Sequence, residues 1–239
     1  MRSVRMMFTK KNSIFFEKYF NERGLSSDES KMSDRGVMNF SQFSYIFRDI
    51  NNALCLGIED NISDVGCGGG GLSVLFSTLV NKVYSYDISE QNINYCKREH
   101  KINNVDFNCN YIEGVSNENI NKMFLGAVVQ YFNETQLTNF IEAISSVKRF
   151  PKLSKIFISH IPDIEKQDDW IDGYKYFIED ENKLKKTRFN QINYNTWYDK
   201  ASLATLLSPF FDVDYLTIDK HIPQHKYCFD MLLTRKVCV

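Results

Sequence analysis

The sequence has almost no imbalance of charge and no long apolar run. Its 239 residues include 29 basic and 30 acidic side chains, which gives a formal net charge of −1. A nearly neutral chain has no overall field that would draw it to nucleic acid or to an anionic membrane. No apolar run is long enough to span a bilayer, and the first residues are charged too early for a signal peptide. We therefore expect a cytoplasmic protein with no nucleic-acid or membrane partner.

Signatures of metal sites and disulfides are also missing. None of the six cysteines forms a C-x-x-C pair, and their spacing from the four histidines matches no metal site. We expect reduced thiols and no metal. The length and the hydrophobic content of 43% suit one globular domain with added segments.

Glycine is concentrated in one stretch, residues 61–73, which contains five of the eleven glycines. The apolar residues before the glycines predict a short buried strand, and those after Gly71 predict a helix. A strand, a glycine turn and a helix place a nucleotide-like ligand at the helix N-terminus. The glycines allow the backbone to turn tightly and to approach the ligand without a Cβ between them.

One pattern within this stretch is that of dinucleotide-binding proteins. Gly66, Gly68 and Gly71 satisfy G-x-G-x-x-G, and Asp87 follows at about the distance expected for a ribose-binding acid. On this pattern the protein would be an NAD(P)-dependent oxidoreductase, which we keep as an alternative.

The second pattern is D-x-G-x-G-x-G, formed by Asp64, Gly66, Gly68 and Gly70, with Cys67 inside the turn. It resembles motif I of the class I S-adenosylmethionine (SAM) methyltransferases, and these five residues are the predicted cofactor loop. An anionic pyrophosphate gains nothing from a carboxylate at Asp64, whereas SAM carries an ammonium and a sulfonium. Charge therefore favours SAM over a dinucleotide.

Further cofactor contacts are expected after the next two strands. Residues 81–87 predict a strand that ends at Asp87, whose carboxylate can accept hydrogen bonds from both ribose hydroxyls. Asp87 could instead cap the next helix, although Ser89 is available for that role. The resemblance places Ile88 against the adenine.

The third strand is predicted over residues 104–109 from its alternating pattern. The resemblance places an adenine-binding residue just after it, where this sequence has Asn110 and Tyr111. Family members usually have an aspartate there, and an asparagine can also accept a hydrogen bond from an amino group.

The acceptor side is predicted at the ends of the fourth and fifth strands, within residues 122–132 and 154–160. The resemblance places Gln130 and Tyr131 near the transferable methyl group, although both could be purely structural. His160 ends the fifth strand, and ligands of open α/β sheets bind at the carboxyl ends of strands. We predict His160 as general base for a hydroxyl acceptor, with Asp163 orienting its ring.

Two more histidines, His221 and His225, lie between the β-rich runs 210–217 and 227–235. They are candidate substrate contacts. A final hairpin of this kind is typical of the methyltransferase fold.

The segment before the glycine strand, residues 1–54, is predicted to be a helical arm rich in aromatic residues. In many small-molecule methyltransferases such an arm covers the cofactor as a lid. Most of its aromatic side chains are expected to pack on the sheet, with Tyr19 as a candidate cofactor contact. Residues 55–239 form the predicted methyltransferase domain, and an insertion at about 162–196 is a candidate substrate cap or a solvated charged face.

The resemblance implies an α/β fold with a Rossmann-like, seven-stranded, mostly parallel sheet, helices on both faces and one antiparallel strand near the edge. It also implies methyl transfer from SAM, with S-adenosylhomocysteine (SAH) as product. The missing nucleic-acid features leave a small-molecule acceptor, for which we favour a hydroxyl group, such as that of a sugar or a phosphorylated precursor of a surface glycan. A non-catalytic SAM-binding or scaffold protein is the remaining alternative.

Overall fold

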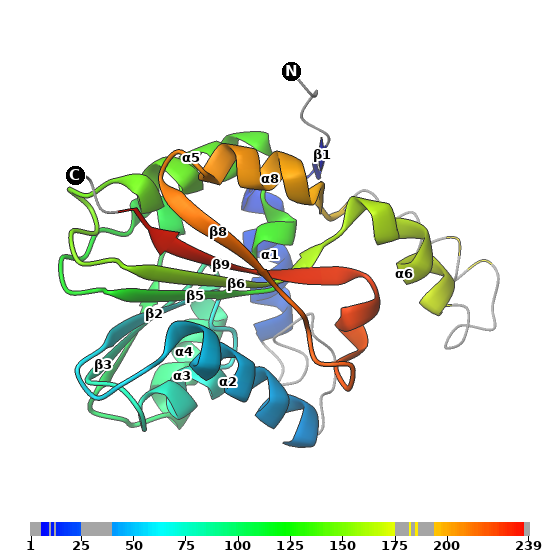
Figure 1. Cartoon of the computed structure of the whole chain (residues 1–239). Coiled ribbons are helices and arrows are strands. Elements are labelled where there is room, and N and C mark those ends of the chain that lie inside the picture. The colour runs from blue at the N-terminus through cyan, green and yellow to red at the C-terminus, as the bar shows by residue number, and fades with distance from the viewer. Residues whose placement is uncertain are drawn as a thin grey trace.

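The computed structural model describes residues 6–9, 11, 13–24, 40–174, 182, 185 and 194–236. Its centre is a seven-stranded sheet with helices on both faces (Figure 1). Across the sheet, the strands are β4 (Val105–Cys109), β3 (Lys82–Asp87), β2 (Asn61–Val65), β5 (Lys122–Gly126), β6 (Lys155–Pro162), β9 (Cys228–Arg235) and β8 (Phe211–Leu216). Five neighbouring strands, β4 to β6, are parallel, and β9 is antiparallel to both β6 and β8. The predicted fold class is confirmed.

The helices form two layers on the sheet. In Figure 1, α5 (Glu134–Ser145) and α8 (Lys200–Leu207) lie above it, and α2 (Phe40–Leu54), α3 (Gly71–Phe76) and α4 (Glu90–Glu99) lie below it. The other elements of the described residues are short or peripheral: β1 (Met6–Met7), α1 (Ser13–Gly24), η2 (Ile112–Gly114), η3 (Val129–Tyr131), η4 (Ile164–Lys166), α6 (Gln167–Tyr174), β7 (Trp197–Tyr198) and η5 (Pro223–Lys226).

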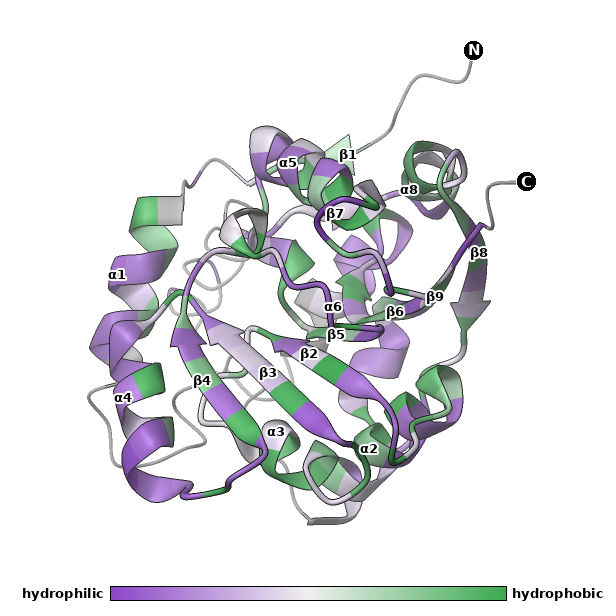
Figure 2. Cartoon of the chain, turned by 90° about the vertical axis from the view of Figure 1, so that its left-hand side faces the viewer, coloured by the Kyte–Doolittle hydropathy of each residue, from purple (hydrophilic) through white to green (hydrophobic). Residues whose placement is uncertain are grey.

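The two layers bury two separate hydrophobic cores, because successive side chains of a strand point to opposite faces. On β5, Met123 and Leu125 enter the core beneath α5 and α8, whereas Phe124 enters the core that contains α2 and α3. The edge strand β4 is alternately hydrophobic and hydrophilic (Figure 2), with Phe107 buried and Asp106 exposed.

Among the described residues of the predicted arm, two helices lie in different places. The face of α2 that carries Ile46, Ile50 and Leu54 is buried in the second core, so this helix is part of the layered domain. The first helix, α1, contacts α4 at the end of the sheet. No helix among the described residues is long and apolar enough to cross a membrane.

The parallel arrangement decides where a ligand can bind. The loops after β2, β3, β4, β5 and β6 all leave the same edge of the sheet, which we call the carboxyl edge. Most of the residues predicted to bind cofactor or substrate lie in these loops.

Candidate functional site

The glycine loop, residues 66–70, connects β2 to α3 with three glycines in left-handed conformations. Their φ angles are 74° at Gly66, 55° at Gly68 and 83° at Gly70. The N–H groups of Gly66 and Cys67 both donate to the carbonyl oxygen of Tyr86 in β3, at 2.7 and 3.0 Å. The loop is therefore fixed to the neighbouring strand through its own backbone.

Gly66 has no space for a side chain. A Cβ at this position would lie 2.3 Å from Cγ2 of Val128, which follows β5. Glycine is therefore required at this position by steric contact as well as by its positive φ.

The back of the glycine loop packs against α4 and β4. Cys96 donates from Sγ to the carbonyl oxygen of Gly68 at 3.2 Å, and Nε2 of His100 lies 2.8 Å from the carbonyl oxygen of Gly69. The Cys67 thiol is hydrogen-bonded to Cys96, and this bond together with burial raises the pKa of Cys67 well above its ordinary value. Cys67 is thus part of the loop packing, and its contact with cofactor stays a prediction.

Asp64 is buried in β2, with 2% of its surface exposed. Its Oδ2 accepts a hydrogen bond of 2.6 Å from the Ser73 hydroxyl of α3, and Ser73 accepts one of 2.9 Å from Ser85 of β3. This network joins the first turn of α3 to two strands. The expected role of Asp64 toward the positive charges of SAM stays a prediction.

Asp87 ends β3 directly beside the glycine loop and is only 8% exposed. Its Oδ2 accepts the N–H of Gly68 at 2.9 Å, and its Oδ1 accepts the N–H of Ser89 at 2.8 Å. Burial raises the pKa of Asp87, and the backbone hydrogen bonds from Ser89 and Gly68 partly oppose that increase. Ser89, not Asp87, caps α4, because its side chain accepts the N–H of Asn92.

The residues after β3 and β4 lie next to Asp87. Ile88 follows it directly and is half-buried. The Asn110 N–H donates to the carbonyl oxygen of Asp87 at 3.0 Å, while the Asn110 side chain is exposed. The half-buried Tyr111 donates its hydroxyl proton to the Glu17 carboxylate of α1.

Helix α1 covers this part of the carboxyl edge. Besides the bond between Glu17 and Tyr111, Oδ1 of Asn21 accepts hydrogen bonds from the Ser89 hydroxyl at 2.9 Å and from the Gln91 N–H at 3.3 Å. The arm therefore contacts the very loops in which ribose and adenine contacts are predicted.

The aromatic side chains of α1 extend this cover to the end of β5. The rings of Phe16 and Phe20 lie 4.8 and 5.2 Å from the ring of Tyr131, measured between centroids. Tyr19 is half-buried on the same helix and packs edge-to-face on Phe20. Gln130 is half-buried beside Tyr131, and its carbonyl oxygen accepts the N–H of Thr196 at 2.7 Å.

His160 lies near the end of β6 at an irregularity in the pairing with β9. Its φ is 60°, and its N–H donates to Oδ1 of Asp230 at 2.8 Å. The ring is 3% exposed, and its Nδ1 lies 3.1 Å from the Ser159 hydroxyl. Ala127, after the neighbouring strand β5, is also left-handed, with a φ of 57°. Backbone strain at non-glycine residues is concentrated at functional sites.

Asp163, which was expected to orient the His160 ring, has other partners. Its carboxylate lies 3.0 Å from Nζ of Lys200 and accepts the N–H of Glu165 at 3.1 Å. His160 instead contacts Ser159 through its ring and Asp230 through its backbone N–H.

The two late histidines lie in the connection between β8 and β9. His221 stacks on Tyr45 of α2 at 4.9 Å, and its Nδ1 is 2.7 Å from Oδ1 of Asp219. Nδ1 of His225 lies 2.9 Å from the carbonyl oxygen of Ile222 in the turn η5. Their contact with substrate stays a prediction.

The structure thus brings most predicted site residues to one edge. Sequence reasoning missed Glu17 and Asn21, which reach from α1 to the loops where cofactor contacts are predicted, and Asp230, which holds the His160 backbone from β9. Asp230 has a sequence signal, because it is the one acid in the apolar run 229–233, whereas Glu17 and Asn21 lie among other polar residues of α1 and have none. Among the described residues, no group of three or more His, Cys, Asp or Glu side chains is arranged to hold a metal ion.

Gly66→Ala tests the geometry of the glycine loop. We expect a lower melting temperature and an at least tenfold weaker affinity for SAH by calorimetry, because the new Cβ meets Val128 and the left-handed φ costs about 1–2 kcal/mol. Gly57→Ala is the control, since a Cβ there meets only Asp60 Oδ2 at 3.9 Å. Equal SAH affinity in the two variants would contradict this description of the loop.

Comparisons with known proteins agree with the fold. A methyltransferase domain family matches residues 58–208, more than half of the chain. A probable cobalt-precorrin-6B C(15)-methyltransferase (decarboxylating) from Methanococcus maripaludis is 33% identical over 113 residues, and the match covers 45% of this chain and 56% of that protein. The chain spans about half the length of the curated relatives it matches.

Two solved structures share the fold over nearly the whole chain. The N-methyltransferase NodS from Bradyrhizobium japonicum, in complex with SAH, has a TM-score of 0.62 at 11% identity and covers 92% of this chain and 98% of its own. Magnesium protoporphyrin IX methyltransferase from Synechocystis, with bound SAH, has a TM-score of 0.61 at 14% identity and covers 93% of this chain and 99% of its own. The glycine loop, the mostly parallel sheet with antiparallel β9 and the family match lead to one conclusion: the chain belongs to the SAM-dependent class I methyltransferase family.

Proposed function

We propose that this protein transfers the methyl group of SAM to a hydroxyl oxygen of a small molecule. The observation that carries the SAM assignment is the hydrogen bond between the Gly68 N–H and the Asp87 carboxylate. It joins the D-x-G-x-G-x-G loop to the acid predicted to bind the ribose.

The residues at the carboxyl edge fit the chemistry of SAM. Oδ1 of Asp87 accepts hydrogen bonds from the Ser89 N–H and the Asn92 amide, whereas Oδ2 accepts the Gly68 N–H, so a lone pair of Oδ2 can accept a ribose hydroxyl. Asp64 and Asp87 together supply negative charge near the loop, which suits a ligand with an ammonium and a sulfonium. When bound, SAM supplies a methyl group that is already activated for displacement.

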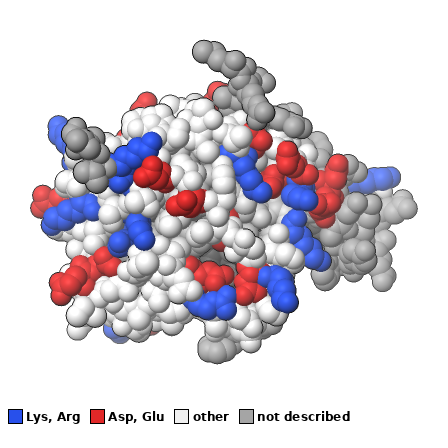
Figure 3. Space-filling view, viewed as in Figure 1, with Lys and Arg blue, Asp and Glu red and all other residues white. Residues whose placement is uncertain are grey.

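The acceptor would lie beside the ends of β5 and β6, where Ala127 and His160 are both left-handed. His160 can act as base at Nε2 when its Nδ1–H donates to the Ser159 hydroxyl, because Nε2 then carries the lone pair. Burial of the ring at 3% exposure keeps water away from the transfer. Acidic and basic side chains are interspersed on the face shown in Figure 3, and the net charge of −1 for the whole chain supports a small-molecule acceptor over nucleic acid.

In the same proposal, α1 acts as a lid on the cofactor, and residues 162–196 form the substrate cap. The contacts of Glu17 and Asn21 support the first assignment. The second is supported by the proximity of Trp170 to Trp197 and Tyr227, at 4.9 and 5.3 Å between ring centroids, next to the end of β6. Much of the cap (175–181, 183–184 and 186–193) lies outside the described residues.

The cofactor assignment is tested by binding. Purified protein should retain SAM or SAH in mass spectrometry, and calorimetry should detect SAH but not NADH. Because the pKa of Asp87 is raised, acidification should weaken SAH binding at a higher pH than an ordinary aspartate would allow, as the protonated carboxyl accepts fewer hydrogen bonds. Asp87→Asn should bind more than tenfold more weakly at neutral pH and lose this pH dependence. Binding of NADH instead of SAH would overturn the proposal.

The role of His160 is tested once a screen of metabolite extracts has identified a methyl acceptor. We expect His160→Ala to keep its SAH affinity while kcat falls about a hundredfold or more and the acid limb of the pH–rate profile disappears, since a positioned base contributes roughly 10²–10⁴-fold. The conservative variant Ser159→Ala should lower kcat less. Near-native turnover of His160→Ala would exclude this residue as the base.

The lid assignment is tested by the rate of cofactor release. The double substitution Glu17→Gln and Asn21→Ala weakens the contacts with Tyr111 and Ser89, so SAH should dissociate several times faster in stopped-flow measurements. Lys18→Ala is the control, because Lys18 is an exposed residue of the same helix. An unchanged dissociation rate would show that α1 does not act as a lid that limits cofactor release.

A further inference from the structure

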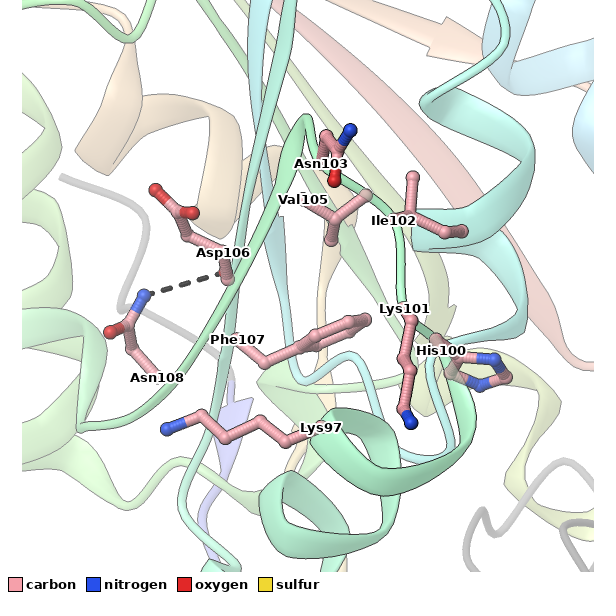
Figure 4. A pocket seen from close by; sticks show the side chains of 9 residues that line it. All are labelled: Lys97, His100, Lys101, Ile102, Asn103, Val105, Asp106, Phe107 and Asn108. Atoms are coloured by element: carbon pink, nitrogen blue, oxygen red, sulfur yellow. Dashed lines mark hydrogen bonds between the residues drawn. The ribbon is translucent and has the colours of Figure 1, made fainter.

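A second concave site lies behind the glycine loop, between the end of α4 and the edge strand β4. This pocket has a volume of about 410 Å³ and is lined by residues between Lys97 and Asn108 (Figure 4). The volume is within the range of small-molecule sites, roughly 300–1,000 Å³. None of the residues predicted to bind the cofactor or the substrate lines it.

The pocket has a cationic rim. Lys97 and Lys101 are exposed members of its lining, and no carboxylate among the described residues is recorded in an ion pair with either. The acid of the lining, Asp106, is neutralised by Nζ of Lys82 at 2.8 Å. The nearby Glu99 is likewise paired, with Nε of Arg98 at 2.6 Å. Positive charge therefore dominates the rim.

The inner wall of the pocket is apolar and its remaining donors are amides. Val105 and Phe107 are 8% and 5% exposed, and the Phe107 ring lies in the middle of the lining in Figure 4. The side-chain amides of Asn103 and Asn108 belong to the same lining; Nδ2 of Asn108 donates to the carbonyl oxygen of Asp106 at 3.4 Å, and each amide has two N–H groups (Figure 4). Lysines and amides around an apolar wall suit an oxyanion that is attached to a flat apolar group.

Two residues of the pocket also touch the cofactor loop. Nε2 of His100 must carry a proton, because its partner at 2.8 Å, the carbonyl oxygen of Gly69, can only accept. A Cβ on Gly70 would lie 3.0 Å from Cδ2 of His100 and 3.1 Å from Cε1 of Phe107. There is therefore no room for a side chain at Gly70, and the hydrogen bond from His100 to Gly69 links this wall of the pocket directly to the glycine loop.

We propose that this pocket is a second ligand site for a small organic oxyanion, a phosphate monoester or a carboxylate, and that its occupancy changes the affinity of the glycine loop for SAM and SAH. The second part rests on the proposed function, because it takes SAM as the cofactor. Lys97 and Lys101 would pair with the oxyanion, Phe107 would contact the apolar group, and His100 would connect the two sites.

The site itself is tested by calorimetry with phenyl phosphate, benzoate and inorganic phosphate at constant ionic strength. We expect saturable binding of phenyl phosphate or benzoate, whichever oxyanion the site prefers, at least tenfold tighter than that of inorganic phosphate. The double variant Lys97→Ala/Lys101→Ala should lose at least tenfold in this affinity. The control Lys148→Ala/Lys152→Ala removes two exposed lysines elsewhere and should bind as the unmodified protein does. Absence of saturable binding, or an equal loss in both double variants, would overturn the site.

The coupling is tested by the SAH dissociation constant with and without the tighter-binding probe. We expect this constant to change at least threefold and then to reach a plateau, and SAH to change the affinity for the probe by the same factor, since coupling between two sites is reciprocal. In His100→Ala, the SAH dissociation constant with the probe should nearly equal the constant without it, so that their ratio approaches one, whatever the basal affinity of that variant.

Two outcomes would overturn the coupling. A ratio of one in the unmodified protein would leave the pocket unconnected to the cofactor loop. A ratio that grows without limit as the probe is added would show direct competition in the cofactor site. Failure of SAH to bind at all would refute the proposed function instead, and the calorimetry with the probe alone would still decide whether the pocket binds an oxyanion.

Discussion

The hydrogen bond from the Gly68 N–H to the Asp87 carboxylate is the interaction on which the site depends. It forms only because β2 and β3 are parallel, with Val65 opposite Tyr86, so that their two loops leave the sheet side by side. Gly68 has a left-handed φ of 55°, and it is its own N–H that donates to Asp87. Burial of the carboxylate is unfavourable and raises its pKa, while the N–H groups of Gly68 and Ser89 offset part of that cost. Loss of one buried partner of this kind costs about 1–3 kcal/mol.

Around this bond, the glycine loop is held from three sides. Val128 fills the space beside Gly66, Tyr86 accepts two N–H groups of the loop, and His100 contacts the Gly69 carbonyl from behind. A loop so constrained presents its backbone to a ligand in one fixed form, which lowers the entropic cost of binding. The contact between His100 and Gly69 places the pocket that His100 lines directly behind the glycine loop.

Helix α1 adds a cover over the loops at the carboxyl edge, which the strands themselves do not supply. The loops after β3, β4 and β5 end beside one another, and α1 crosses them with Asn21, Glu17 and the aromatic pair Phe16 and Phe20. On the acceptor side, the antiparallel strand β9 supplies Asp230, which holds the His160 backbone in its left-handed conformation. Both contacts join segments that are far apart in the chain.

Local pattern determined the sheet and the glycine loop. The strands over 61–65, 82–87, 122–126 and 155–162 follow from mainly apolar segments and the strand over 105–109 follows from alternation, while the left-handed turns follow from glycine at positions where other residues are strained. Asp87 was predictable because it ends a strand whose neighbour in a parallel sheet is the glycine strand. Its position beside Gly68 therefore follows from topology alone.

Long-range packing decided the rest. The sequence predicts an aromatic arm, but only the folded chain separates α2, which is buried in the second core, from α1, which lies on the cofactor loops. Asp163 was expected beside His160 because it is near in sequence, yet its carboxylate pairs with Lys200, and the residue that holds His160 comes from β9, seventy positions away. Nor does any local pattern place His100 behind Gly69 or form a pocket there. The spacing of residues along the chain specifies where the backbone can form a tight turn or a strand with alternating faces. The partners of a buried polar group depend instead on which distant element packs against it.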